Sequence, residues 1–212
     1  MMKDLVVLVA DGQMEFTVRG LLTRGPSLQF RDISFDIWVH PAKDPGCLLR
    51  GHELLRSFTR QYAHAMVMHD REGCGRDDYS REALESEIES NLARSGWHDR
   101  AAAIVIDPEL EVWVWSDSPE VVGILGWTGR QPTLAQWLDQ QGHCAPGQSK
   151  PQKPKKAVDD ALRSSGKRRS SSIFRQLAER VSVHRCTDPA FWKFKALLQQ
   201  WFSKSPETTE ER

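Results

Sequence analysis

The feature that most constrains the fold is a repeated alternation between short apolar runs and longer segments with helical spacing. Three runs, DLVVLVA, HAMVMHD and AAAIVID, have the length of strands and are nearly uninterrupted, as expected for strands buried on both faces. A fourth, ISFDIWVH, alternates apolar and polar residues like a half-exposed strand. Helical spacing fills the intervals, at residues 13–22, 47–62 and 80–96. We therefore predict an α/β fold with a parallel-rich sheet flanked by helices.

Acidic residues follow three of these runs, at Asp11, Asp70 and Asp107. Ligands of open α/β sheets bind at the carboxyl ends of the strands, so we expect these acids at one edge. Glu15 lies one helical turn after Asp11, and Glu72 shares a face with Asp70 in an extended segment. Such carboxylates suit a hard cation such as Mg²⁺. The spacing is equally compatible with acids that only cap helices and solvate loops.

The formal net charge of zero conceals two oppositely charged parts. Residues 1–147 carry 14 Lys and Arg against 22 Asp and Glu, whereas residues 148–212 carry 15 against 7. Within the second part, residues 148–175 hold nine basic residues, opposed only by Asp159 and Asp160. An acidic body with a basic C-terminal region indicates two separate tasks.

The C-terminal region has two kinds of composition. Pro, Ser and Lys are dense in residues 148–156, which indicates a mobile, solvent-exposed connection. Apolar residues at helical spacing predict helices at 173–181 and 189–201. The expected organisation is an α/β domain at 1–147, a basic linker or mobile loop at 148–172, C-terminal helices packed on the body at 173–203, and a frayed tail at 204–212.

Several classes of protein are disfavoured. The four cysteines form no CxxC pair, which favours reduced thiols in a cytoplasm over a disulfide framework or a structural zinc site. No apolar run reaches the roughly 18 residues of a membrane span, and acids flank the first run, unlike a signal peptide. The sequence lacks a phosphate-binding glycine loop and a GxSxG elbow, and Arg81 stands where an EF-hand needs its final glutamate.

Five segments of the sequence carry motifs that can be compared with those of a known family. VVLVADGQMEFTVRGLL resembles the first Toprim motif, a strand that ends in an acid-Gly pair with a second acid three residues after the glycine. MVMHDREG resembles the second motif, the strand-ending D-x-D, with Glu72 as its second acid. IDPELEVWVWSD, KPKKAVDDAL and DPAFWKFKALLQQW are similar to later parts of the same group. Together these motifs resemble a Toprim-like family of uncharacterised bacterial proteins, and the resemblance covers most of the chain.

The resemblance implies a nucleic-acid phosphodiesterase dependent on Mg²⁺ (or Mn²⁺) that serves bacterial defence against phage. Related Toprim proteins are the overcoming-lysogenization-defect nucleases, primases and topoisomerases. By position, Asp11 takes the general acid/base place, with Glu15 beside it in the catalytic group. The implied metal ligands are Asp70, Glu72, Glu109 and Glu111. Asp11 replaces a longer glutamate and Glu72 replaces an aspartate of the family pattern, so a non-catalytic adaptor that binds other defence proteins is the alternative.

The basic region supplies the expected contacts with nucleic acid, because cations neutralise phosphates. The candidate residues are Lys153, Lys155, Lys156, Lys167, Arg168 and Arg169. The alternative is that these side chains form only a solubilising surface. The eight tryptophans could anchor a protein partner, although Trp38, Trp113 and Trp115 lie in apolar runs that more often belong to a core. The type of nucleic acid and the oligomeric state stay open.

Overall fold

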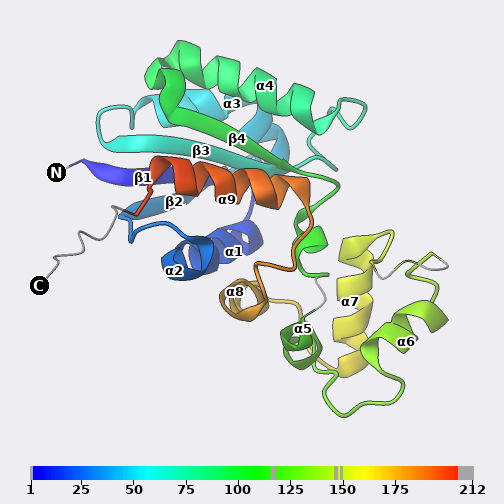
Figure 1. The fold of residues 1–212 in the computed structure, drawn as a ribbon. Helices are drawn as coiled ribbons and strands as arrows, with labels where there is room; N and C mark the ends of the chain where they lie inside the picture. Colours follow the sequence, from blue (N-terminus) through cyan, green and yellow to red (C-terminus); the bar gives the residue numbers. More distant parts are fainter. Residues whose placement is uncertain (1, 116–117, 146–147, 149, 205–212) are drawn as a thin grey trace, which may run out of the picture.

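The computed structural model describes residues 2–115, 118–145, 148 and 150–204. Within them the chain forms a four-stranded, all-parallel sheet with helices on both faces (Figure 1). The strands, in the order β2-β1-β3-β4, are β1 (Lys3–Val9), β2 (Phe35–Val39), β3 (Tyr62–Asp70) and β4 (Ala101–Ile106). Each strand coincides with a run that the sequence predicted as a strand, so the prediction of an α/β fold with a parallel sheet is confirmed.

The parallel register places the carboxyl ends of the strands at one edge of the sheet. Leu8 of β1 lies opposite Trp38 of β2 and Val67 of β3. The central strands β1 and β3 are buried on both faces, which is why their sequences are continuous apolar runs. Asp11 follows β1 and Asp70 ends β3, so the two acids come from neighbouring strands at the same edge.

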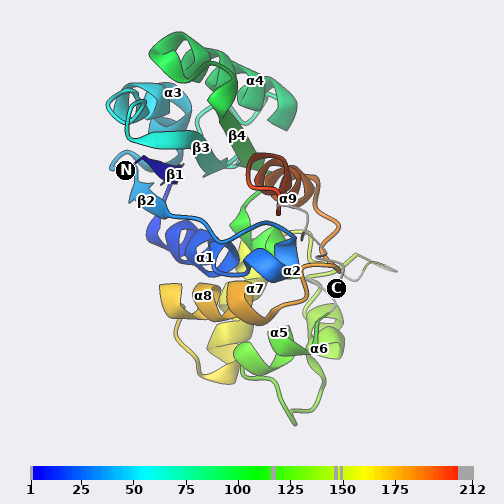
Figure 2. The same ribbon diagram turned by 60° about the vertical axis from the view of Figure 1, so that its left-hand side comes forward.

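Helices form two layers on the sheet and a smaller group beside it. Helices α3 and α4 lie on one face, and α1 and α9 lie on the other, with α8 packed on the side of α1 away from the sheet (Figures 1 and 2). Helices α5, α6 and α7 lie beyond α8, away from the sheet (Figure 2). The bounds are α1 (Gly12–Leu22), α2 (Gly25–Leu28), α3 (Lys43–Arg56), α4 (Arg81–Leu92), α5 (Pro119–Ile124), α6 (Leu134–Gln140), α7 (Pro154–Ser165), α8 (Ser171–Arg180) and α9 (Pro189–Trp201), with the short turns η1 (Ala93–Trp97), η2 (His98–Arg100) and η3 (Leu110–Trp113). None of the described helices is both long and apolar enough to cross a membrane.

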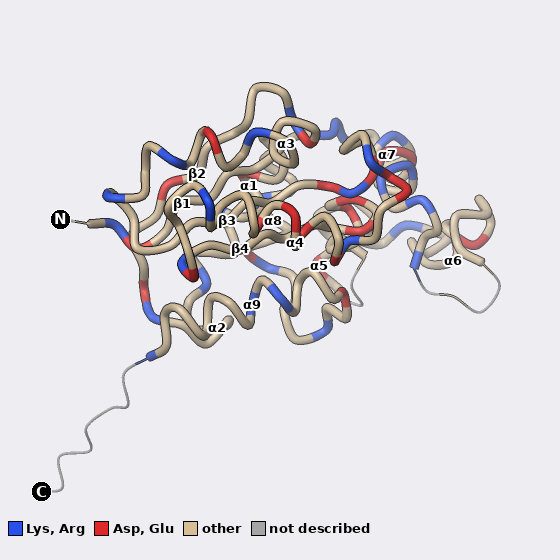
Figure 3. The backbone as a smooth tube through the Cα atoms, turned by 90° about the horizontal axis from the view of Figure 1, so that it is seen from above, with Lys and Arg blue, Asp and Glu red and all other residues tan. Residues whose placement is uncertain are grey.

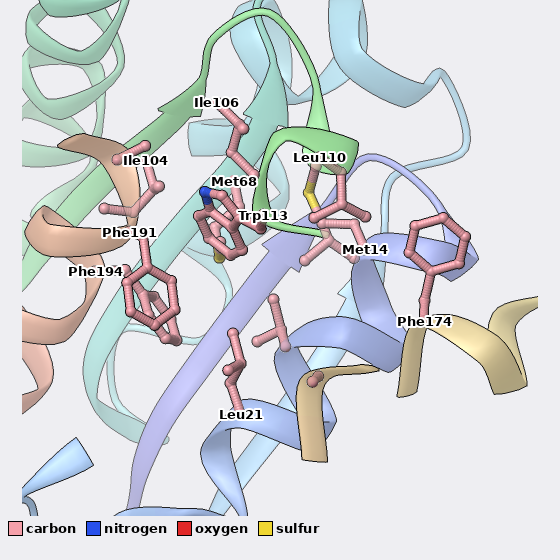
Figure 4. Packing of buried hydrophobic residues seen from close by; sticks show 14 of the residues in the cluster. Met14, Leu21, Met68, Ile104, Ile106, Leu110, Trp113, Phe174, Phe191 and Phe194 are labelled. Atoms are coloured by element: carbon pink, nitrogen blue, oxygen red, sulfur yellow. The ribbon is translucent and has the colours of Figure 1, made fainter. Parts of the chain in front are cut away.

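The core beneath the second layer joins segments that are distant in the sequence. Met68 of β3 and Ile104 of β4 lie close to Trp113 of η3 and to the rings of Phe191 and Phe194 (Figure 4). The Trp113 and Phe191 rings meet edge to face, with centroids 5.3 Å apart. Helix α9 is therefore held against the sheet by aromatic packing.

Helices α8 and α9 confirm the two helices predicted from apolar spacing. Helix α8 packs closely on α1 because Gly20 has no side chain: a Cβ there would lie 2.9 Å from the Cβ of Ala178. Residues 205–212 of the predicted frayed tail lie outside the described residues.

The prediction of a linker or mobile loop at 148–172 is wrong for its larger part. Helix α7 occupies Pro154–Ser165 and buries Ala157, Val158, Ala161 and Leu162, which recur at helical spacing. Trp115 also fixes the start of the helix, since its indole N–H donates to the Pro154 carbonyl at 3.0 Å. The density of Lys and Pro hid this apolar stripe, because the exposed Lys155 and Lys156 interrupt it and Pro154, at the first position of the helix, is also typical of a linker.

The two edge strands of the sheet, β4 and β2, differ in what covers them. On β4, the amides of Ala103 and Val105 donate to the carboxylates of Glu89 (3.1 Å) and Glu85 (3.0 Å) from α4. Lys193 of α9 neutralises both carboxylates. The opposite edge strand, β2, instead leaves Trp38 48% exposed.

Asp188 provides a test of how α9 is anchored. One carboxylate oxygen accepts both the Phe191 amide (3.0 Å), which caps α9, and the indole N–H of Trp113 (2.8 Å). We expect Asp188→Ala to lower the free energy of unfolding by about 2–4 kcal/mol, since a helix cap is lost and a buried donor is left unpaired. Ser80→Ala, which removes only the cap of α4, is the matched control and should cost about 1 kcal/mol. Equal losses in urea unfolding would show that the Trp113 bond contributes nothing.

Candidate functional site

The carboxyl edge of the sheet carries a group of five carboxylates. They come from the loop after β1, the first turn of α3, the end of β3 and the segment after β4. We call them the acid cluster: Asp11, Asp44, Asp70, Glu109 and Glu111.

Asp11 is held in place as the cap of α1. Its Oδ1 accepts the amides of Gln13 and Met14, each at 2.8 Å. These bonds satisfy two of the free amides at the start of the helix and fix the carboxylate at the strand end. Among the described residues, Oδ2 has no hydrogen-bond partner, so this oxygen is available to a ligand.

Asp70 ends β3 and is the carboxylate on which the charges of three other acids of the cluster act. Its Oδ1 accepts the Leu110 amide at 2.9 Å, and its own amide donates to Asp44 Oδ1 at 2.9 Å. Burial raises the pKa of Asp70 well above its usual value, and the charges of Asp44, Glu111 and Asp11 raise it further. The nearby Lys155 opposes this rise only in part. Asp70 therefore holds its proton to higher pH than an ordinary aspartate does.

Glu109 and Glu111 enter the acid cluster from the start of η3. Glu109 Oε1 accepts the Lys155 amide at 2.8 Å, while burial and the charges of Glu111 and Glu72 raise the pKa of Glu109. The side chain of Glu111 is 2% exposed. Its Oε1 forms an ion pair with Arg169, but its Oε2 is buried without a hydrogen-bond partner. One carboxylate oxygen in the cluster is thus desolvated and unsatisfied.

Two cations from the C-terminal region face these carboxylates. Arg169 contacts Glu111, and its Nη1 lies 2.8 Å from Asp159 Oδ1. The same guanidinium bonds to Gln13 Oε1 and lies over the Phe174 ring, 4.8 Å from its centroid. Lys155 Nζ lies 3.7 Å from Glu109 Oε2. Figure 3 shows this interleaving of basic and acidic segments around α7.

Three of the predicted acidic residues lie apart from the acid cluster. Glu15 forms an ion pair with Arg19 at 2.8 Å on the side of α1. Asp107 pairs with Arg71 at 2.8 Å and is 46% exposed. Glu72 is exposed, and its charge contributes to the raised pKa of Glu109. The cluster therefore contains Asp11, Asp70, Glu109 and Glu111 of the predicted residues.

The cations predicted to contact nucleic acid are largely engaged within the protein. Besides Lys155 and Arg169, Lys156 pairs with Asp160, and Lys167 Nζ donates to the Ile124 carbonyl at 2.6 Å. The side chains of Lys153 and Arg168 have no ion-pair or hydrogen-bond partner in the part of the chain that the structure describes. Only these two match the expected free basic surface.

Asp44 was missed by the sequence prediction. It lies in the first turn of α3, five residues after the end of β2, and so reaches the same edge as Asp11 and Asp70. The rule that ligands gather at the carboxyl ends of strands applies to β2 as well, and would have drawn attention to Asp44. Asp159, opposite Arg169, could not have been found, because it comes from a helix predicted as linker.

The acid cluster fits a divalent cation in its chemistry. Hard cations prefer carboxylate oxygens, and a cation would relieve both the unpartnered Glu111 Oε2 and the raised pKa of Asp70. Over the described residues, no three His, Cys, Asp or Glu side chains are placed to hold a metal ion as they stand. Arg169 and Lys155 already contact two of the carboxylates, so metal binding requires these side chains to move.

Comparisons with protein-family models, with curated proteins and with solved structures give no significant match. The interpretation of the site therefore depends on its own geometry.

Replacement of Asp70 should reveal the raised pKa as a dependence of stability on pH. In the unfolded chain the residue ionises near pH 4, whereas the folded protein holds its proton to higher pH. Rising pH thus destabilises the folded wild type within that window, by up to about 1.4 kcal/mol per pH unit. Asp70→Asn keeps the acceptor for Leu110 and cannot ionise, so we expect its stability advantage to grow with pH.

The measurement is the free energy of urea unfolding of both proteins between about pH 4 and about pH 8. Asp107→Asn is the control at the same edge, because this exposed carboxylate is paired with Arg71. Parallel pH curves for wild type and Asp70→Asn would contradict the expectation.

Proposed function

We propose that the chain is a metal-dependent phosphodiesterase acting on nucleic acid, with the acid cluster as its active site. The observation that carries the proposal is the meeting of Asp11, Asp70 and Glu111 at the carboxyl edge of a parallel sheet. This is where open α/β sheets bind their ligands. The resemblance to Toprim-like proteins supports the same chemistry and adds a role in bacterial defence against phage, with a Toprim-like fold and a cytoplasmic location.

We assign a different role in the proposed reaction to each group of residues in the acid cluster. Asp70 and Glu111, with Glu109, would hold Mg²⁺ or Mn²⁺. When bound, such an ion supplies positive charge against a substrate phosphate. Asp11 is fixed by the amides of α1 through one oxygen and would move a proton with the other. Asp44 positions Asp70, because its carboxylate accepts the Asp70 amide.

We expect Asp70→Asn to lower nuclease activity by about 100-fold or more. Loss of a metal ligand should lower activity more than loss of a residue that only hydrogen-bonds to a ligand, which typically costs about 10- to 100-fold. The measurement is cleavage of single-stranded DNA, duplex DNA and RNA with Mg²⁺ and with Mn²⁺. Asp107→Asn should keep full activity, because Asp107 lies at the same edge but pairs with Arg71. Wild-type protein that cleaves no nucleic acid with either metal would overturn the enzymatic function.

A second candidate function is that of a non-catalytic adaptor for other defence proteins. The observation that favours it is the ion pair between Arg169 and Glu111, which provides the acid cluster with a counter-ion from the chain itself. In an adaptor this pair is permanent and holds the C-terminal region on the body. In the enzyme it is exchanged for a metal ion.

Arg169→Gln separates the two functions. Glu111 is then left buried without a cation, so we expect a loss of about 3 kcal/mol in the free energy of unfolding. If the acid cluster accepts Mg²⁺, millimolar Mg²⁺ should restore part of the loss, because a ligand that binds only the folded state stabilises it. Arg175→Gln, which breaks the surface pair with Glu179, should cost less than about 1 kcal/mol and should not respond to Mg²⁺. A Mg²⁺-independent loss in Arg169→Gln favours the adaptor.

A further inference from the structure

An exposed surface beside the acid cluster combines an aromatic ring with unpaired cations. It runs along α3 and the outer strand β2, on the face of the sheet opposite to α1 and α8 (Figures 1 and 2). We call it the α3 flank and define it by Trp38, Lys43, Arg50, Phe58 and Arg60. None of these residues belongs to the basic C-terminal region.

Trp38 gives the α3 flank a rigid aromatic platform. Its side chain is 48% exposed at the edge of the sheet. Phe58, just beyond α3, supports it from behind, with ring centroids 5.6 Å apart and planes 25° apart. Phe58 is in turn braced edge to face by Tyr62, 5.7 Å away. The indole thus has one face packed and substantial area open to solvent.

The cations of the α3 flank are free to contact a ligand. Lys43, Arg50 and Arg60 are exposed, and their side chains form no ion pair or hydrogen bond with any residue that the structure describes. Arg50 lies near His40, which follows β2. Burial lowers the pKa of His40, and the positive charge of Arg50 lowers it further. The same stretch exposes one acid, Glu53. The balance of charge therefore attracts a polyanion.

One end of the α3 flank adjoins the acid cluster. Lys43 immediately precedes Asp44, whose carboxylate accepts the Asp70 amide at 2.9 Å. Helix α3 then carries Arg50 away from the cluster toward Phe58 and Trp38. A chain bound along this surface would have one end beside the carboxylates.

We propose that the α3 flank binds single-stranded nucleic acid, with a base stacked on Trp38 and phosphates on Lys43 and Arg50. Stacking requires a base that is free of a duplex, and tolerates any sequence because every base has an aromatic face. The inference deepens the proposed function by naming single strands as its substrate class, and it rests on that function for this step. It also explains how an acidic edge receives a polyanion when Lys155 and Arg169 are occupied by carboxylates.

Binding is measured without cleavage, by fluorescence anisotropy of a labelled oligothymidylate in EDTA. We expect Trp38→Ala to weaken binding by roughly 5- to 100-fold and Trp38→Phe to retain most of it. Trp192→Ala is the matched control: Trp192 is also 48% exposed, but it lies on α9 against Lys195 and should leave binding unchanged. Circular dichroism and thermal unfolding verify that each variant is folded.

The dependence on salt tests the cations separately. Arg50→Gln and Lys43→Gln should each reduce the slope of log affinity against log salt by about 0.7, the value for one phosphate contact with a single strand. Lys156→Gln, which removes a cation paired with Asp160, should leave the slope unchanged.

Several outcomes would overturn the inference. They are tighter binding of duplex than of single strands, equal effects of Trp38→Ala and Trp192→Ala, and self-association through Trp38 in place of nucleic-acid binding. Failure of the proposed function gives a different result: the protein binds single strands through Trp38 in EDTA but cleaves nothing with Mg²⁺ or Mn²⁺. If cleavage depends on Asp70 but not on Trp38, and KM is unchanged in Trp38→Ala, the α3 flank does not bind the substrate, whereas the proposed function still holds.

Discussion

The ion pair between Arg169 and the buried Glu111 is the contact on which the arrangement of the site depends. Glu111 comes from η3, directly after the sheet, and Arg169 lies 58 residues later, between α7 and α8. The guanidinium also reaches Gln13 on α1 and Asp159 on α7, and it lies over Phe174 on α8. A single charged group therefore joins four segments around the carboxyl edge. Loss of Arg169 would leave the buried Glu111 carboxylate without a counter-ion, which is among the most costly defects in a protein interior.

This contact gives the division of charge along the sequence a structural explanation. The acidic body and the basic C-terminal region neutralise each other where Lys155 and Arg169 meet Glu109 and Glu111. Cations used in this way are weaker candidates for binding phosphate, because a ligand must first separate an existing pair. Lys153 and Arg168 apart, the free cations beside the site lie elsewhere, along α3 near Trp38. The charge composition was interpreted as two separate tasks, and it did not indicate that the opposite charges would meet inside the same chain.

The fold could be predicted because its signals are local. The runs that became β1, β3 and β4 are apolar since each is covered on both faces, and strand length and side-chain burial are visible in a few consecutive residues. Helix α7 was missed although its apolar stripe is equally local, because Pro154 at its start and the exposed Lys155 and Lys156 resembled a linker. The same edge rule that located Asp11 and Asp70 extends to Asp44, which follows the short edge strand β2.

The sequence by itself determined the strands, most of the helices and the placement of Asp11 and Asp70 at strand ends. These follow from periodicity and from the rule that parallel strands end at one edge. Only the tertiary structure decided which acids form the acid cluster and which cations stay free. Glu15 forms an ion pair with Arg19, Asp107 with Arg71, and Arg169 with Glu111. The physical reason is that an ion pair depends on the distance between its two charges and on their burial. Both are set by the packing of segments that are distant in the sequence, as the contact between Gln13 and Arg169, 156 residues apart, shows.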